Sequence, residues 1–243
     1  MRAFDPRPEA AEFWRRVGEA EPFPRELRRP VTNTLPVAVV HLPRLTISDA
    51  SAWLSERGVE GTLTAADRPL RGCLVAHRGH GFIFLDGGLE PDEERVTLSQ
   101  EVSHFVRHYE RRRVAAARKM GPAILEALDG DRPLTAAERV SAVLRDIPVG
   151  VYRHTMGRDG AGRPDAHTME LEAEADLLGF ELLAPSWRVA KSSMPGADCR
   201  ELLQVAYGFP SESALAWARW IDARRAPDPF LARLEVAAKK VSD

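Results

Sequence analysis

Residues 95–108 read RVTLSQEVSHFVRH, and this stretch carries the strongest structural signal in the chain. Apolar side chains recur there at helical spacing and form one stripe: Leu98, Val102, Phe105, Val106 and Tyr109. Pro91 and the acidic residues at 92–94 come just before, where proline needs no amide donor and acids face the positive end of a helix. The pattern predicts a helix from about Glu94 to Ala115.

The polar residues of this helix have the spacing of a metal site. Gln100 and His104 lie one turn apart and share a helix face, which is the geometry that a metal requires of two ligands on one helix. Zinc peptidases of the His-Glu-x-x-His type have histidine at both positions, and their glutamate takes a proton from water. Glu101 and His104 match that pattern, whereas Gln100 does not. The pattern alone is common, so its meaning depends on the rest of the chain.

A second helix supplies an independent match. Apolar periodicity predicts a helix over Met169–Leu183, which stops at Pro185. This segment contains Glu-Ala-Glu-Ala-Asp at 172–176 and Glu-Leu-Leu-Ala-Pro at 181–185. Together with residues 95–108, these motifs resemble the ImmA/IrrE family of zinc metallopeptidases. Members of that family combine a His-Glu-x-x-His helix with a Glu-x-Glu-Ala-Asn segment that ends in Leu-Leu-Met-Pro.

The resemblance has its motifs in residues 70–185 and covers residues 36–225 more widely. It implies an α+β fold: a small mixed sheet of about three strands, packed on the helix that carries the active site, plus several further helices. Short apolar runs predict the strands, of which the last two form a hairpin: Val59–Ala65, Leu70–His77 and Gly81–Leu85. Helical patterns also occur at Glu9–Gly18, Ile47–Arg57, Ala123–Leu128, Thr135–Arg145, Ala197–Tyr207 and Ser211–Ile221.

The resemblance implies a role for four residues on the two long helices. His104 would be a zinc ligand, and Glu101 would be the general base. Glu172 would be the third protein ligand, chosen over the glutamates at 170 and 174 for its spacing to the proline that ends the helix. Asp176, one turn further on, would accept a hydrogen bond from a ligand imidazole.

The glutamine at position 100 departs from the family pattern. An amide oxygen is neutral and binds zinc more weakly than an imidazole nitrogen does. The loss of one ligand in three should cost several kcal/mol, judged against the ~10–16 kcal/mol apparent for closed structural sites. Zinc is therefore a possible cofactor of doubtful occupancy. The outcome that we favour from the sequence is an inactive scaffold without a metal.

Two other outcomes would keep a metal. A replacement ligand could come from the long insert at residues 116–168, whose histidines are His154 and His167. Alternatively, the site could slide along the first helix to three residues in an i, i+3, i+7 pattern on one face: Glu101, His104 and His108. In the second case Glu101 would be a ligand and no longer a free base.

Composition favours a globular protein of the cytoplasm. The hydrophobic fraction of 44% argues against wholesale disorder, and the net charge of -2 argues against general attraction to nucleic acid or an anionic membrane. Cys73 and Cys199 are far apart and do not indicate a disulfide framework. Because neither a signal-peptide pattern nor a membrane-length apolar run is apparent, we expect a cytoplasmic location.

The predicted organisation places one domain between two extensions. Residues 1–34 would be an N-terminal extension outside the core, and residues 226–243 a tail. The metallopeptidase-like domain would span residues 35–225, with the long insert at 116–168 and a C-terminal helical cap at 186–225.

Three functional hypotheses follow. The first is an ImmA/IrrE-like regulatory protein with a degenerate zinc site, which binds a protein partner such as a helix-turn-helix repressor; the resemblance alone implies this partner. The second is an active zinc-dependent endopeptidase with an unusual ligand set. The third is a DNA-associated regulator, because two helices joined by a short turn at residues 208–210 suggest a helix-turn-helix. Apolar residues of the last helix favour core packing instead of nucleic-acid binding: Leu215, Trp217, Trp220 and Ile221.

Overall fold

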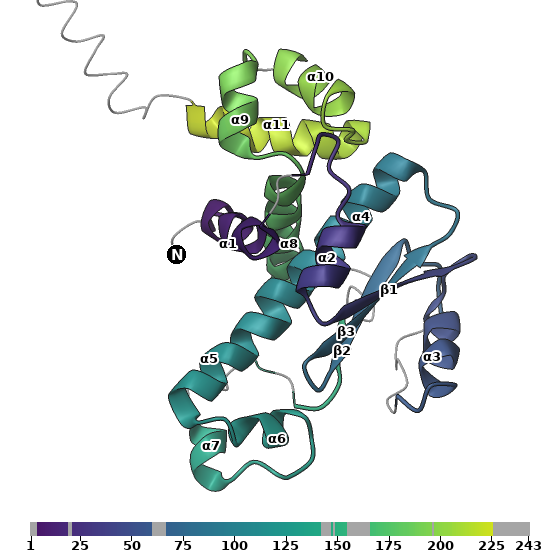
Figure 1. The fold of residues 1–243 in the computed structure, drawn as a ribbon, viewed down its shortest axis with the longest axis vertical. Coiled ribbons are helices and arrows are strands. Elements are labelled where there is room, and N and C mark those ends of the chain that lie inside the picture. The colour runs from purple at the N-terminus through teal and green to yellow at the C-terminus, as the bar shows by residue number, and fades with distance from the viewer. Residues whose placement is uncertain are drawn as a thin grey trace, which may run out of the picture.

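The computed structural model describes residues 4–18, 21–59, 67–141, 147, 149–154, 166–195 and 197–225. Within this part of the chain, a small mixed sheet is surrounded by helices, so the predicted α+β class is confirmed (Figure 1). The sheet contains β1 (Val37–Leu42), β2 (Gly72–His77), β3 (His80–Asp86) and β4 (Tyr152–His154). Their order is β1-β3-β2-β4, with β1 parallel to β3 and the other neighbours antiparallel.

The β2–β3 hairpin lies where the sequence predicts it. Arg78 and Gly79 at its turn have φ angles of 50° and 84°, which are typical of a two-residue turn that matches the twist of the strands. The prediction of about three strands falls short, because β1 and β4 were not expected. With only three residues, β4 is too short to show an alternating pattern. Of the predicted strand Val59–Ala65, only Val59 belongs to the described residues.

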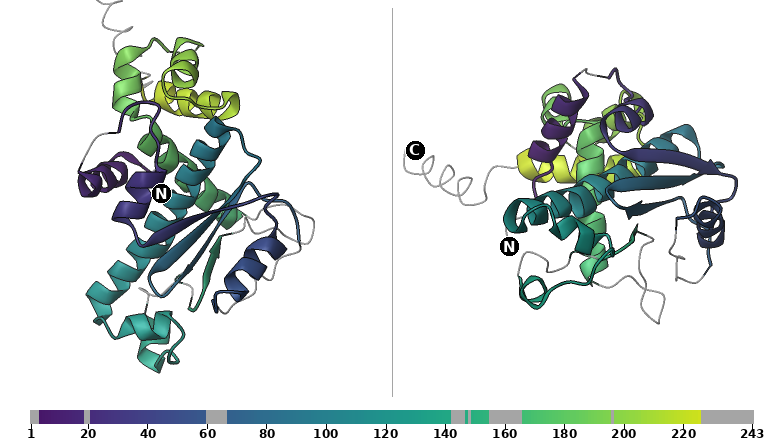
Figure 2. Two further views of the ribbon diagram at one scale, coloured as in Figure 1. Left: turned by 45° about the vertical axis from the view of Figure 1, so that its right-hand side comes forward. Right: turned by 60° about the horizontal axis from the view of Figure 1, so that its bottom comes forward.

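Helices cover both faces of the sheet. Alternate side chains of β2 point to opposite faces: Leu74 and Ala76 join the main core, whereas Cys73 and Val75 join a second cluster. The second cluster packs against α3 (Ile47–Ser55). The main core packs against the long helix that begins at Pro91. Both views in Figure 2 show this helix apart from α3.

The long helix is continuous but not uniformly α-helical. It begins as α4 (Pro91–Ser103), passes through the π-helical segment η1 (His104–Glu110) and continues as α5 (Arg111–Met120). In the π-helical segment the amide of Arg111 donates to the carbonyl of Val106, five residues earlier. The sequence predicted a regular helix there. Single π-helical turns are rare and occur often at functional sites, because they change the direction in which a side chain points.

The N-terminal segment belongs to the core, so its prediction as an extension outside the core is wrong. It forms α1 (Arg7–Val17) and α2 (Arg28–Thr34). Phe13 and Val31 are buried in the main core cluster. The indole of Trp14 also donates to the carbonyl of Leu182 over 3.2 Å. The apolar faces of α1 and α2 are therefore covered by the domain itself.

The remaining helices lie at the two ends of the molecule (Figure 1). The insert forms α6 (Ile124–Leu128) and α7 (Ala136–Val140) beside α5, with a small core of its own. At the other end, α8 (Ala166–Leu183) leads into α9 (Ser186–Ser192), α10 (Ala197–Val205) and α11 (Ser211–Arg225). Among the described residues, no helix combines the length and the apolar character that a bilayer crossing requires.

The crossing of α8 over α4 depends on a glycine. A Cβ atom at Gly179 would lie 2.7 Å from Ser99 Oγ and 3.2 Å from the backbone nitrogen of Gln100. We expect Gly179→Ala to lower the free energy of unfolding by about 1–2 kcal/mol, since overpacking outweighs the higher helix propensity of alanine. Urea unfolding would measure the change, with Glu170→Ala on the exposed face of α8 as the control. An unchanged midpoint for Gly179→Ala would contradict this close packing.

Candidate metal centre

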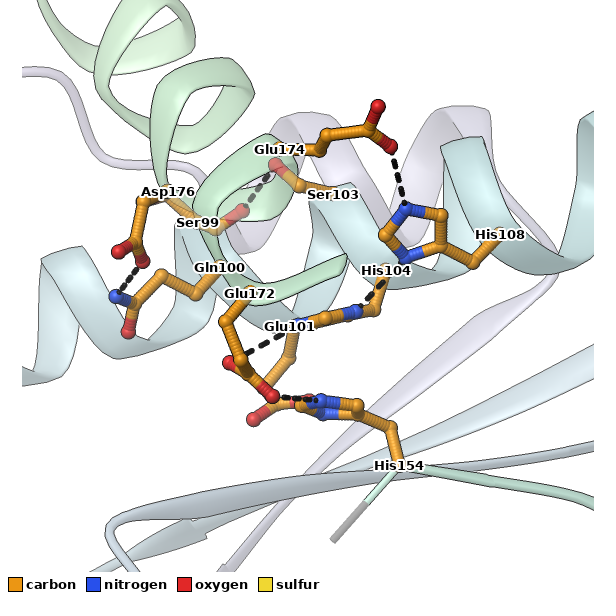
Figure 3. Close-up of polar contacts among 10 residues, drawn as sticks. All are labelled: Ser99, Gln100, Glu101, Ser103, His104, His108, His154, Glu172, Glu174 and Asp176. Carbon is orange, nitrogen blue, oxygen red and sulfur yellow. Dashed lines mark hydrogen bonds and ion pairs between the residues drawn. The ribbon is translucent and has the colours of Figure 1, made fainter. Parts of the chain in front are cut away.

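Three elements that are distant in sequence meet beside the sheet (Figure 3). The end of α4 and the start of η1 provide His104, the first half of α8 provides Glu172, and β4 provides His154. One ligand atom from each of these residues lies within 4.8 Å of the others. The structure therefore brings together His104 and Glu172, and it adds His154 from the insert. This cluster could hold a metal ion.

His154 lies between two carboxylates. Its Nε2 atom is 2.6 Å from Glu172 Oε1, and its Nδ1 atom is 3.3 Å from Glu101 Oε2. Burial by itself would lower the pKa of His154, but the two carboxylates outweigh burial and raise the pKa to about 10. Burial of Glu172 is likewise outweighed by His104 and His154, so the pKa of Glu172 lies well below its ordinary value. The carboxylates of Glu101 and Glu172 thus favour a positive charge at the position between them.

His104 is fully buried and has one ring nitrogen without a partner. Its Nδ1 atom is 3.0 Å from Nδ1 of His108. Its Nε2 atom makes no hydrogen bond and lies 3.6 Å from Glu172 Oε2. The ring stacks on His154 at a centroid distance of 3.3 Å. Burial, together with His154, lowers the pKa of His104, so the buried imidazole is neutral.

His108 lies behind His104 and does not face the cluster. Its Nε2 atom is 3.4 Å from Glu174 Oε2, and burial together with His104 lowers its pKa to about 3. The sequence offered His108 as a substitute ligand in a site that slides to Glu101, His104 and His108. That arrangement is wrong for this structure, because His108 points away from the cluster toward Glu174.

The separation of His104 and Glu172 suits a small cation. Ligands placed tetrahedrally at about 2.0–2.1 Å from zinc are roughly 3.3–3.4 Å apart, close to the 3.6 Å between His104 Nε2 and Glu172 Oε2. If Nδ1 of His104 carries the ring proton, its Nε2 lone pair points at an ionised carboxylate without a proton between them. A cation between these two atoms would convert that unfavourable contact into two bonds. The donor set fits a metal ion.

Gln100 is not part of the cluster. Its side-chain amide donates to Asp176 Oδ1. We expected Asp176 to accept a hydrogen bond from a ligand imidazole. This expectation is wrong for this structure, because Asp176 accepts the hydrogen bond of Gln100 instead. Burial raises the pKa of Asp176 to about 6, against the opposing effect of the Gln100 hydrogen bond. The pair joins α4 to α8 next to the cluster without adding a ligand.

Glu101 stands at the edge of the cluster and is not one of its ligands. It faces His154 and lies against β2, where a Cβ atom at Gly72 would be only 3.3 Å from Glu101 Oε1. Because Gly72 has no side chain, the carboxylate of Glu101 has room beside β2. His167, the other histidine of the insert, is exposed at the start of α8 and does not belong to the cluster.

The cluster opens into a cleft of about 710 Å³. It is lined by the chain that enters β2, at residues 68–72, and by the start of α11, at residues 210–213. Gln100, Glu101 and Asp176 line its inner part. A cleft of this size takes a segment of several residues or a ligand of comparable volume.

The C-terminal helices pack on the domain with the side chains that the sequence indicated. Trp217 is fully buried and donates to the carbonyl of Ala184 over 3.0 Å, and Ile221 is buried beside it. Leu215, by contrast, is exposed. Arg225 donates to the carbonyl of Val189 in α9 and to Ser193 directly after it, so this cation serves a contact within the chain.

Comparisons with protein-family models, with curated proteins and with solved structures give no match for this chain.

Proposed function

We propose that this protein is a zinc-dependent peptidase of the ImmA/IrrE type, in which His154 replaces the ligand that the family has at position 100. The ligand set would be His104, His154 and Glu172. One observation carries the proposal: the buried, unpartnered Nε2 atom of His104 faces a carboxylate, with a second imidazole beside them. Two imidazoles and one carboxylate are the protein ligands of many catalytic zinc sites.

The residues around the cluster support hydrolysis. Zinc held by three protein ligands supplies Lewis-acid activation of a water molecule and of a carbonyl group. Glu101 would take the proton of the attacking water and pass it to the leaving amine, because it is beside the ligands and on the cleft. A peptide segment in the cleft would lie between the entry to β2 and the start of α11.

The substrate class comes from the family resemblance. Proteins of this family act on helix-turn-helix repressors, and we propose a protein substrate of that kind here. The competing hypothesis is a scaffold that binds such a partner without a metal. Its only support is that Gln100 replaces a histidine ligand of the family. The presence of His154 beside His104 and Glu172, as a donor that Gln100 does not supply, supports the hydrolytic alternative.

Metal analysis tests the proposal directly. We expect one zinc ion per chain in protein purified without added zinc, or in protein to which one equivalent of zinc has been restored. A chelator should remove this zinc. Zinc at about 100 times its dissociation constant should stabilise the fold by about 2.7 kcal/mol, which a thermal melt would detect. Magnesium at the same concentration is the control, since nitrogen ligands disfavour it. Protein that neither retains zinc nor gains stability from it would leave the metal-free scaffold as the better hypothesis.

A further inference from the structure

His108 and Glu174 are not ligands of the proposed site, yet they adjoin His104 (Figure 3). We infer that they form a positioning pair, which fixes the tautomer of His104 so that its Nε2 atom is free to bind a metal. The inference rests on the proposed metal site for its purpose. The tautomer itself is a property of the metal-free protein and can be measured separately.

The carboxylate of Glu174 determines the first proton. Its Oε2 atom accepts a hydrogen bond from Arg107 Nε over 2.8 Å and lies 3.4 Å from His108 Nε2. A carboxylate paired with an arginine stays ionised and can only accept hydrogen bonds. The Nε2 atom of His108 must therefore carry a proton, or two lone pairs would face each other in a buried place.

The second proton follows from the first. A neutral imidazole with its proton on Nε2 has a bare Nδ1 atom, and Nδ1 of His108 faces Nδ1 of His104 at 3.0 Å. Only one proton fits between the two nitrogens, so His104 donates it. The alternative, a doubly protonated His108, would place a second cation next to Arg107, on the same Glu174 oxygen. The proton on Nδ1 of His104 leaves its Nε2 atom bare and directed at Glu172.

The contact joins two histidines four residues apart on one helical segment. His104 and His108 both lie within η1, and both are buried, with 0% and 2% of their surface exposed. Their ring centroids are 5.1 Å apart, and the rings are inclined by 52°. Because a metal-bound histidine usually donates its other ring proton to an acceptor that fixes its orientation, this arrangement matches a known requirement of metal sites. Here the acceptor is a second histidine on the same helix.

Two substitutions at His108 test the inference. His108→Leu fills the space without an acceptor, whereas His108→Asn retains an acceptor atom at the δ position. We expect His108→Leu to weaken zinc binding by about 10- to 100-fold, and His108→Asn to restore part of the loss. Competition with a chromophoric chelator would measure both affinities. His41→Leu is the matched control, since His41 pairs with Glu94 at 2.9 Å outside the cluster.

A second readout separates this inference from the proposed function. Nitrogen-15 NMR of the metal-free protein reports which ring nitrogen of His104 carries the proton. We expect the Nδ1–H tautomer in the natural chain and a mixture in His108→Leu. The Nε2–H tautomer in the natural chain, or equal zinc affinity in all variants, would overturn the inference. The Nδ1–H tautomer in a protein that binds no zinc would support the positioning pair and contradict the zinc peptidase.

Discussion

Replacing His154 with alanine should abolish tight zinc binding, although this residue lies 50 positions from the motif that suggested a metal. It is one of only three proposed ligands, and its imidazole stacks on His104 and bonds to Glu172. Removal of one ligand in three should cost several kcal/mol, and about 2.8 kcal/mol already corresponds to a 100-fold weaker affinity. Zinc content after gel filtration and competition with a chelator would measure the loss.

The control for this prediction is His167→Ala. Both histidines belong to the same insert, but His167 is exposed at the start of α8 and lies outside the cluster. We expect this variant to bind zinc as the natural chain does. Equal zinc binding in the two variants would show that β4 does not supply a ligand. The metal would then have to be held by another set of residues, and the proposed replacement of the family ligand would be withdrawn.

Replacing Glu101 with glutamine should remove peptidase activity and leave the metal in place. The side chain keeps its size and its contact with Gly72, but the amide cannot take a proton from water. General-base catalysis commonly contributes about 10²- to 10⁴-fold, so we expect kcat to fall by about that factor. Hydrolysis of a labelled, unfolded protein substrate would measure the rate, with zinc content determined on the same sample.

The combination of the two measurements identifies the role of Glu101. Lost activity with retained zinc supports a general base. Parallel loss of zinc would mean that Glu101 acts through the metal, either as a ligand or as the carboxylate that orients His154 across their 3.3 Å contact. That result would contradict the role we give it. Glu94→Gln, which changes an acid of the same helix that pairs with His41 and does not line the cleft, is the matched control and should leave both quantities nearly unchanged.

The sequence predicted the helical parts of the site well, because helical periodicity can be recognised within a short stretch of residues. The apolar stripe from Leu98 to Tyr109 placed the first long helix, and the run up to Pro185 placed the end of α8. The family resemblance implied that His104 and Glu172 meet, and the structure brings them together. The π-helical turn at η1 was not predicted, since the same apolar spacing fits a regular helix.

Residues outside the long helices were harder to predict. His154 was only one of two histidines offered by the insert, and its strand is too short to be recognised by periodicity. The proline-rich and charged composition of residues 1–34 predicts an extension, yet Phe13 and Val31 in this segment are buried. Each of these errors concerns a segment whose partners are distant in the chain.

The sequence by itself determined the class of the fold, the two long helices and the residue types from which a metal site could be built. Periodicity, proline positions and short motifs act over a few residues, and they can be read without knowing what lies opposite. Only the tertiary structure decided which donors meet. The pairing of β4 with β2 sets His154 against Glu172, and the glycine at 179 lets α8 approach α4. The packing of the two long helices also sets His108 against Glu174. Such contacts join residues far apart in the chain, so no local pattern encodes their distance.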